Sequence, residues 1–551
     1  MPSLFQLWAL PGALLAIANI SVTWYNLVSE NVPEPYLDEA FHVPQAQRYC
    51  NNDYTWDPKI TTPPGLYLAS LLIDGVAGCE TSTLRSLNAG AICLICLVSY
   101  NLLRSVRKGS SNQTKDVQYG QANPLSLLDA HSALNISLFP PMFFFSALYY
   151  TDVMSTLVVL ISYSTFLGRK DTTNPFFHNM VFVVIGIIAL LFRQTNIFWV
   201  AVFPAALAVV DALKENGGIS PAGHHLKTIL KMGWSDGKVY DCCVESAGPQ
   251  DFLIFFASLA LAAIKRPFLI VKSVSPYLVL LALFVGFVVW NGSVVLGDKS
   301  AHTATLHLPQ MLYFWPYVVF FSVPLTIGSV LSPFVGLLPT GPRTVIEDHI
   351  TGKAKVLFPS FISATLFMVS GLTAVHYNTI IHPYTLADNR HYVFYVFRIL
   401  RRHPTINYAA VPLYYICAWM TFQTLGEKTP GEDPAKQTSQ EKRSVDNNTP
   451  SQPCQISFVV AWVATATLSV ATAPLVEPRY FIIPWIMWRL HVPYLPGPRE
   501  EQASGKRRLY DMRLVLETVW LLTINAVLGY NFLYRGFSWP QEPGKVQRFL
   551  W

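Results

Sequence analysis

Two adjacent carboxylic acids, Asp38 and Glu39, follow the first long apolar stretch of the chain. Acidic side chains are common at helix N-termini, where they complement exposed main-chain N–H groups, so the pair has a structural explanation. The chemical explanation is a general base at the lipid–water boundary. Partial burial raises the pKa of a carboxyl group and lets its ionised form accept a proton from a sugar hydroxyl. We favour the chemical explanation and leave the structural one open.

A second polar cluster lies between residues 382 and 392 and contains His382, Asp388, Arg390 and His391. The guanidinium group of arginine matches the geometry of phosphate oxygens, so the cluster predicts a phosphate-binding site. A solvated loop is the alternative interpretation. The two histidines do not indicate a metal, because no cysteine lies nearby and the spacing is not that of an HExxH motif.

Other polar residues stand directly against apolar segments, where an ionisable group is costly and therefore suggests function. An arginine at an interface can also extend its guanidinium group to water, so Arg479 alone is ambiguous. Taken together, these residues predict a polar cleft at one face of a membrane, which suits group transfer from a lipid-linked phosphate. The residues concerned are Asp152, Arg193, Asn196, Asp298, His302 and Arg479.

The elements that must position these residues follow from composition. The chain has 551 residues, of which 52% are hydrophobic and 13% charged, whereas soluble proteins carry roughly 25% charged residues. An all-α, polytopic membrane protein is therefore expected, with about 12–14 spans of about 20 apolar residues each. No basic stripe interleaves with aromatic residues, so nucleic-acid binding is not predicted.

Loop charge predicts the topology. Residues 101–120 hold four basic and one acidic residue, whereas residues 28–65 hold six acidic and two basic ones. Basic loops face the cytosol, so residues 28–83 are expected to form the first luminal loop, with interfacial helices. The apolar stretch ending near Gly78 could instead span the membrane, but that would invert the later loops. Counting spans then places Asp152 and Arg193 on the luminal side. If residues 252–264 do not cross the membrane, the same count also places residues 290–302, 382–391 and 477–479 on the luminal side.

We expect one membrane-embedded domain over residues 1–551, with two departures. Residues 211–251 are predicted to be a cytosolic insertion, and residues 427–453 a disordered cytosolic loop because of their polar composition. Cys93 and Cys96 lie within an apolar span and are expected to be free thiols. A disulfide between Cys50 and Cys79 is possible, but free thiols are favoured.

Two long motifs resemble a known family. Residues Tyr36–Cys50 and Trp56–Tyr67 closely resemble the endoplasmic-reticulum dolichyl-phosphate-glucose α-1,2-glucosyltransferases, which belong to the GT-C class of membrane glycosyltransferases. The resemblance implies a multi-pass protein of the endoplasmic-reticulum membrane, a luminal active site, a dolichyl-phosphate-glucose donor and no cofactor or metal. Further matches are Arg193–Asn196, Gly297–His302, Pro309–Gln310, His382–Tyr392, Glu477–Pro484 and Gln547–Trp551.

The resemblance also implies roles for individual residues. Asp38 would be the base, with Glu39 its orienting neighbour or the base itself. The donor phosphate would be bound by Arg390, His391, Arg479 and His382. The sugar or the acceptor would be bound by Asp152, Arg193, Asn196, Asp388, Asp298, His302, His42, Gln45 and Trp56.

The implied reaction transfers glucose, with inversion, to the 2-hydroxyl of the terminal glucose of a diglucosylated dolichyl-diphosphate-linked oligosaccharide. This is the last step in assembling the N-glycan precursor. A GT-C enzyme that uses dolichyl-phosphate-mannose is one alternative. A transporter or accessory protein is another, although transporters more often carry mid-span charges and two similar halves. The lipid bilayer is the expected setting, and the sequence leaves protein partners open.

Overall fold

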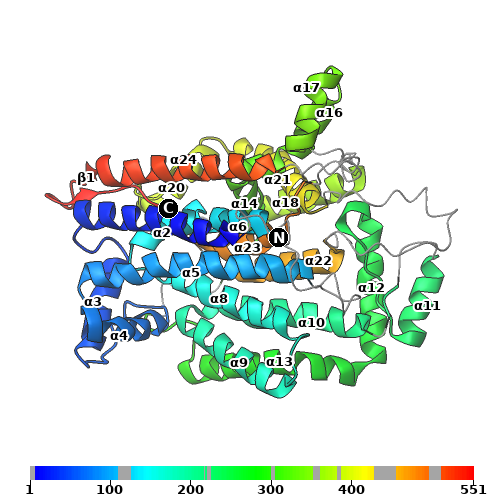
Figure 1. Cartoon of the computed structure of the whole chain (residues 1–551), viewed down its shortest axis with the longest axis horizontal. Coiled ribbons are helices and arrows are strands. Elements are labelled where there is room, and N and C mark those ends of the chain that lie inside the picture. The colour runs from blue at the N-terminus through cyan, green and yellow to red at the C-terminus, as the bar shows by residue number, and fades with distance from the viewer. Residues whose placement is uncertain are drawn as a thin grey trace.

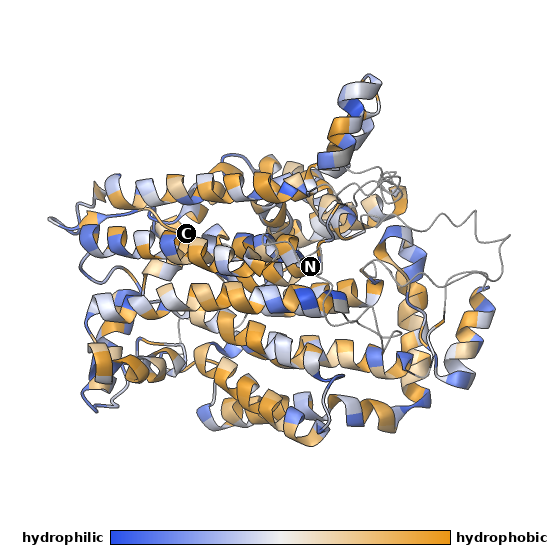
Figure 2. Cartoon of the chain, viewed as in Figure 1, coloured by the Kyte–Doolittle hydropathy of each residue, from blue (hydrophilic) through white to orange (hydrophobic). Residues whose placement is uncertain are grey.

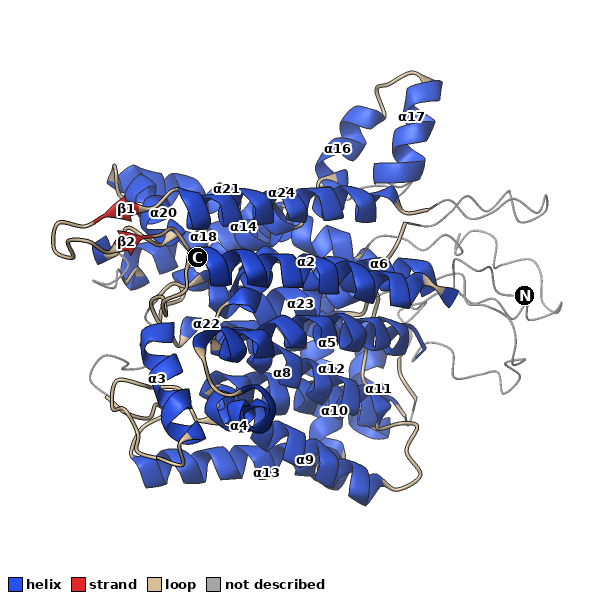
Figure 3. Cartoon of the chain, turned by 60° about the vertical axis from the view of Figure 1, so that its left-hand side comes forward, coloured by secondary structure: helices blue, strands red, loops and turns tan. Residues whose placement is uncertain are grey.

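Nearly all of the described chain is helical, as Figure 3 shows. The computed structural model describes residues 7–108, 126–215, 217–219, 225–298, 305–351, 360–380, 386–426, 454–473, 475–495 and 510–551. Within these ranges the strands β1 (Phe537–Ser538) and β2 (Val546–Gln547) form one small antiparallel sheet. The predicted all-α polytopic class is confirmed, whereas the 427–453 loop lies outside the described residues.

Seven described helices are long and apolar enough to cross a membrane. Their apolar residues prevail along their length, while hydrophilic residues gather toward the ends and in the loops (Figure 2). They are α2 (Ala9–Asn31), α5 (Thr81–Lys108), α8 (Thr151–Gly168), α9 (Pro175–Phe192), α10 (Phe203–Lys214) with the turns η2 (Gln194–Asn196) and η3 (Phe198–Val202) before it, α13 (Pro267–Asn291) and α24 (Met512–Tyr534).

The other helices are shorter or more polar, so the seven fall below the predicted 12–14 spans. They are α3 (Glu39–Cys50), α4 (Gly65–Ala77), α6 (Ser126–Ser137), α7 (Pro140–Phe143), η1 (Phe144–Ala147), α11 (Leu226–Asp236), η4 (Val244–Ser246), α12 (Pro249–Lys265), α14 (Pro309–Phe321), α15 (Val323–Thr326), α16 (Gly328–Val335), α17 (Thr340–Ile346), η5 (Glu347–Thr351), α18 (Phe361–Asn378), α20 (Tyr392–Leu400), α21 (Pro404–Leu425), α22 (Ile456–Ala471), η7 (Pro478–Phe481) and α23 (Ile482–His491).

Proline breaks explain part of this difference. The apolar stretch of residues 133–149 is interrupted, because α6 ends at Ser137 and the chain resumes at Pro140 as α7 and η1. A proline lacks an N–H group and clashes with the preceding turn, so it starts a helix more readily than it continues one. The break turns the chain, so that α8 begins at Thr151 and carries Asp152 in its first turn.

Two pairs of short helices lie at opposite ends of the bundle (Figure 1). α3 and α4 lie at the end where β1 is also found, whereas α11 and α12 lie at the other end. The 13 residues of α4 extend for about 20 Å, less than the roughly 30 Å of a hydrocarbon core. In the same view α12 lies across the direction of the long helices. Both observations favour the interfacial interpretation of these helices.

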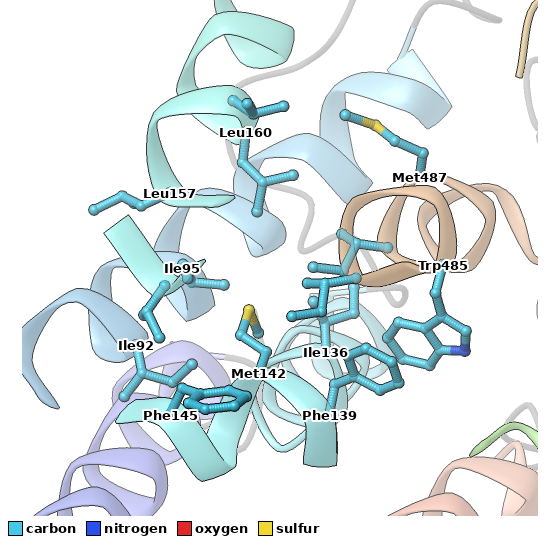
Figure 4. Packing of buried hydrophobic residues seen from close by; sticks show 14 of the residues in the cluster. Ile92, Ile95, Ile136, Phe139, Met142, Phe145, Leu157, Leu160, Trp485 and Met487 are labelled. Atoms are coloured by element: carbon cyan, nitrogen blue, oxygen red, sulfur yellow. The ribbon is translucent and has the colours of Figure 1, made fainter. Parts of the chain in front are cut away.

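The centre of the bundle is packed with aromatic and branched side chains (Figure 4). The rings of Phe139 and Trp485 stack with their centroids 3.7 Å apart. Ile92 and Ile95 of α5 and Leu157 of α8 continue the same core. This packing joins α23 to the N-terminal helices. Because α23 directly follows η7, the packing also restricts the movement of η7.

A buried ion pair anchors the 32–39 segment to α5. Arg85 donates from Nε to Glu39 Oε1 at 2.8 Å and from Nη2 to Oε2 at 2.6 Å. Both side chains are at most 1% exposed. Glu39 also accepts hydrogen bonds from the main-chain N–H groups of Tyr149 and Tyr36, at 2.6 and 3.1 Å. A single carboxylate therefore fixes three separate segments of the chain.

A disulfide joins Cys50 at the end of α3 to Cys79 just after α4, with their Cα atoms 6.5 Å apart. The expectation of free thiols at these positions is wrong. Their separation of 29 residues gave no indication of this proximity, which depends on how α3 and α4 pack together. Cys93 and Cys96 are free, as predicted.

We predict that Glu39→Gln will destabilise the protein, because it leaves Arg85 as a buried charge without a countercharge. Breaking one partner of a buried ion pair costs about 3–5 kcal/mol. Thermal unfolding of the detergent-purified protein measures the effect, and Glu34→Gln, at a nearby acidic residue outside the pair, is the control. Equal stability of the Glu39 variant and the wild type would contradict the prediction.

The disulfide predicts that peptide mapping without reductant will recover the Cys50 peptide linked to the Cys79 peptide. Cys50→Ala should lower the stability against unfolding by roughly 3 kcal/mol, because the cross-link restricts the unfolded chain. Cys93→Ala is the matched control, since that thiol is free. Recovery of alkylated Cys50 and Cys79 from unreduced protein would show that the bond is absent.

Candidate active site

Asp38 lies in the turn that leads into α3. The preceding residue, Leu37, has a positive φ of 53°, a conformation that L-residues adopt at some energetic cost. The main-chain N–H of Asp38 donates to the hydroxyl of Tyr150 at 3.2 Å. The Asp38 side chain remains 44% exposed. The turn therefore presents this carboxylate to a ligand, whereas the adjacent Glu39 is fully buried in its ion pair.

Arg479 of η7 joins three carboxylates. Its Nη1 donates to Asp38 Oδ2 at 2.9 Å, and its Nη2 lies 2.8 Å from Glu477 Oε2. The same Nη1 is 3.7 Å from Asp152 Oδ2. Arg193 follows α9 and places its Nη2 3.0 Å from Asp152 Oδ1. Residues far apart in the sequence thus form one charged cluster, as the predicted polar cleft requires.

The electrostatics of Asp38 differ from our expectation. Desolvation raises the pKa of Asp38, but the Arg479 guanidinium group, and His42 more weakly, outweigh it and hold the pKa below its ordinary value. The expectation of a raised pKa for Asp38 is therefore wrong, because the nearby positive charge outweighs the effect of burial. A positive partner at 2.9 Å favours the ionised carboxylate. Asp38 is consequently an unprotonated acceptor at neutral pH.

A small cleft of about 90 Å³ lies beside this cluster. Asp388, His391 and Glu477 supply its polar lining, and Val393, Leu475, Val476 and Pro478 the rest. Arg390 donates to Asp388 of this lining, from Nε at 2.9 Å and from Nη2 at 2.7 Å. Its guanidinium group also lies 4.4 Å from the ring centroid of Trp539. The 388–391 loop therefore meets the Glu477–Arg479 turn at the cleft.

Several residues that were predicted to bind the sugar or the acceptor make structural contacts instead. Both ends of the Gln45 amide bind main-chain groups of the first loop, at Thr55 and Asp57. The Trp56 indole donates to the carbonyl of Ile60. Asn196 is 1% exposed and donates to Ser155 and Ala189. For these three residues the geometry favours support of the fold over sugar binding.

The remaining residues that were predicted to belong to the site have different outcomes. His42 lies near Asp38, and its Nδ1 is 2.6 Å from the Tyr67 hydroxyl. The main-chain N–H of Asp298 donates to the Pro58 carbonyl, so this residue joins the first loop and not the cleft. His302 and His382 lie outside the described residues.

Three contributors were not among the predicted site residues. Arg85 could have been found, since a lone arginine in an apolar helix calls for a buried partner. Glu477 was part of a noted motif but was not chosen as a site residue. Tyr150 gave no signal, because its hydroxyl reaches Asp38 only through the break between α6 and α8.

The cluster can hold a base and neutralise an anion. Asp38, Asp152 and Glu477 each form an ion pair with a guanidinium group. Within the described part of the chain, one grouping has metal-ligand spacing, namely Cys50, Asp74 and Cys79. Its two thiols are joined in the disulfide.

The chain is similar to several known proteins. It is 40% identical to the Dol-P-Glc:Glc(2)Man(9)GlcNAc(2)-PP-Dol alpha-1,2-glucosyltransferase of Aspergillus fumigatus, over 100% of this chain and 98% of that protein. The protein of the same name from Emericella nidulans is 41% identical, over 99% and 98%. The mouse protein of that name is 31% identical, over 98% of each chain.

Among solved structures, the Archaeoglobus fulgidus oligosaccharyltransferase in the apo form matches 100% of this chain and 62% of its own. Its TM-score is 0.29 and its sequence identity 12%, a likeness too weak to support an argument. A family model described as DIE2/ALG10 matches residues 32–490, which include Asp38, Arg390 and Arg479. Because this match covers most of the chain and the relatives align along their full length, the chain belongs to the DIE2/ALG10 family.

Proposed function

We propose that this protein transfers glucose from dolichyl-phosphate-glucose, with inversion, to the 2-hydroxyl of the terminal glucose of Glc2Man9GlcNAc2-diphosphate-dolichol. The observation that carries the proposal is the contact between Asp38 and Arg479 beside the cleft, which pairs an exposed carboxylate base with a cationic group. The name shared by relatives at 40% and 41% identity supports the substrates. It also favours glucose over the mannose donor that the sequence left open.

In the proposed step, a carboxylate oxygen of Asp38 accepts the proton of the acceptor hydroxyl. The hydroxyl oxygen then bonds to the anomeric carbon of glucose, while the bond from that carbon to the phosphate oxygen breaks. The phosphate leaves as an anion, so it needs positive charge and not a proton. His391 lines the cleft, and Arg479 directly follows Pro478, which also lines it. Arg390 is paired with Asp388 of the same lining. We assign the binding of the phosphate to these three cationic side chains. One displacement at the anomeric carbon inverts its configuration.

Glu39 is the less suitable base. Its two oxygens already accept hydrogen bonds from Arg85 and from two main-chain N–H groups, and its side chain is 0% exposed. An acceptor sugar would have to displace these partners before it could approach. We therefore assign the proton transfer to Asp38, with Glu39 holding the turn that presents it.

The site is proposed to face the lumen of the endoplasmic reticulum. The Cys50–Cys79 disulfide lies at the same end of the bundle as Asp38. Disulfides persist in oxidising compartments such as this lumen and are rare in the cytosol. The acidic first loop supports the same orientation. No metal or cofactor is proposed, because guanidinium groups can supply the positive charge.

We predict that the purified protein will add one α-1,2-linked hexose to the diglucosylated lipid-linked oligosaccharide, with dolichyl-phosphate-glucose as donor and a chelator present. Asp38→Asn should reduce the transfer rate by about 10²–10⁴-fold, because a general base contributes that much. Asp53→Asn, an exposed acid of the same loop, is the control. Near-normal transfer by Asp38→Asn would remove the base assignment, and transfer from dolichyl-phosphate-mannose alone would overturn the donor.

The low pKa of Asp38 predicts how the rate depends on pH. The base acts when ionised, so the rate falls as the pH drops through its pKa, which lies below the usual value of about 3.9. Arg479→Gln removes the charge that lowers this pKa. The acidic limb of the kcat profile should therefore move to higher pH, in addition to any loss of donor binding. Arg398→Gln, at an exposed arginine of α20, should leave the limb in place. An unmoved limb in Arg479→Gln would contradict the assignment.

A further inference from the structure

The motif Gln547–Trp551 has no role in the reaction described above. Residues 546–551, here called the 546–551 segment, begin as strand β2, which pairs with β1. Figure 3 shows this sheet at the end of the bundle where α3 lies. Gln547 and Leu550 are each 2% exposed, so the segment is packed into the protein. It therefore lies close to both loops that form the candidate site.

One side of the segment holds the phosphate-binding loop. Leu550 donates to the carbonyl of Arg390 at 3.0 Å and accepts from the N–H of Tyr392 at 3.1 Å. The side-chain oxygen of Gln547 accepts from Arg390 Nη1 at 2.9 Å. His391 Nδ1 lies 2.6 Å from the main-chain oxygen of Trp551. Both the main chain and the side chains of Arg390 and His391 are thus fixed by this segment.

The other side holds the turn that carries the base. The hydroxyl of Tyr36 accepts from the main-chain N–H of Arg548 at 2.7 Å and donates to its carbonyl at 2.9 Å. Tyr36 is two residues before Asp38, and its own N–H binds Glu39. A single side chain therefore connects the segment to the carboxylate pair.

Arg548 attaches the same segment to the scaffold. Its guanidinium group donates to Phe532 and Leu533 near the end of α24, each at 2.8 Å, and to Asn31 at the end of α2, at 3.0 Å. These carbonyl groups have no partner within their own helices, so the arginine satisfies them. The segment is thereby fixed relative to two of the long helices.

We infer that the 546–551 segment is a positioning strap, which sets the distance between the Asp38 base and the Arg390–His391 phosphate site. The inference rests on the proposed function and deepens it. Tyr36 and Arg548 are positioning residues, since their contacts are with the protein and not with reacting atoms. Transfer requires the acceptor oxygen and the anomeric carbon to be aligned closely, and a shift of about 1 Å can cost about 10²-fold in rate.

Tyr36→Phe tests the strap, because it keeps the ring packing against Phe532 and removes only the hydroxyl group. We expect kcat for glucose transfer to fall roughly tenfold, because the turn that carries Asp38 loses its hydrogen bonds to the segment and a small misalignment of the reacting groups slows transfer. Arg548→Lys should retain part of the rate that Arg548→Ala loses, and it provides a milder variant if alanine prevents folding. Tyr530→Phe, at an exposed tyrosine of α24, is the matched control and should match the wild type.

Kinetics and stability are measured on the same preparations. A segment that only stabilises the fold would lower the melting temperature of the Tyr36 and Arg548 variants and leave kcat of the folded fraction unchanged, which would overturn the inference. Amide hydrogen exchange gives a second test. Tyr36→Phe should speed exchange at Tyr392, whose N–H is bound by the segment, and unchanged exchange there would also overturn it. Absence of transfer by the wild type is a separate result, which would overturn the proposed function and this inference with it.

Discussion

The ion pair between Glu39 and Arg85 is the interaction on which the candidate site depends. It is buried, and desolvating two charges costs several kcal/mol per ion unless hydrogen bonds satisfy them. Here Arg85 binds both oxygens of Glu39 through Nε and Nη2 and donates further to the carbonyls of Val32 and Glu34, while Glu39 accepts from Tyr36 and Tyr149. The pair therefore does more than hold two helices together. It fixes the turn before α3, from which Asp38 projects, against the break that leads into α8.

Adjacent acids in one motif have different roles because their surroundings differ. Glu39 is buried, and both of its carboxylate oxygens accept hydrogen bonds. Asp38 is partly exposed and shares Arg479 with Glu477 and Asp152. Arg193 also pairs with Asp152, so two guanidinium groups serve the three carboxylates. An anionic donor phosphate would therefore compete for Arg479, and that competition would weaken its hold on Asp38. In the proposed reaction, the base and the bound phosphate would in this sense be coupled through one side chain.

The rest of the structure brings these pieces to one end of the bundle. Stacking of Phe139 on Trp485 joins the α6–α7 break to α23, and η7 with Arg479 directly precedes α23. Toward the other end, Arg489 and Glu517 form a second buried pair between α23 and α24. Thus the helix that follows Arg479 is fixed by aromatic packing near one end and by an ion pair near the other, which limits how far Arg479 can move.

The sequence alone determined the membrane class, the orientation expected from loop charge and most of the residues that meet at the site, because charged groups beside apolar spans are costly and stand out. It also indicated the family through the motifs around Asp38 and Trp56. Only the tertiary structure separated Asp38 from Glu39, paired Cys50 with Cys79, reversed the expected pKa shift and assigned Gln45 and Asn196 to the scaffold. The contrast between the two acids and the pKa shift depend on Arg85 and Arg479, and local residue types and spacing carry no information about such distant partners. The disulfide and the contacts of Gln45 and Asn196 depend on how the neighbouring helices and loops pack together.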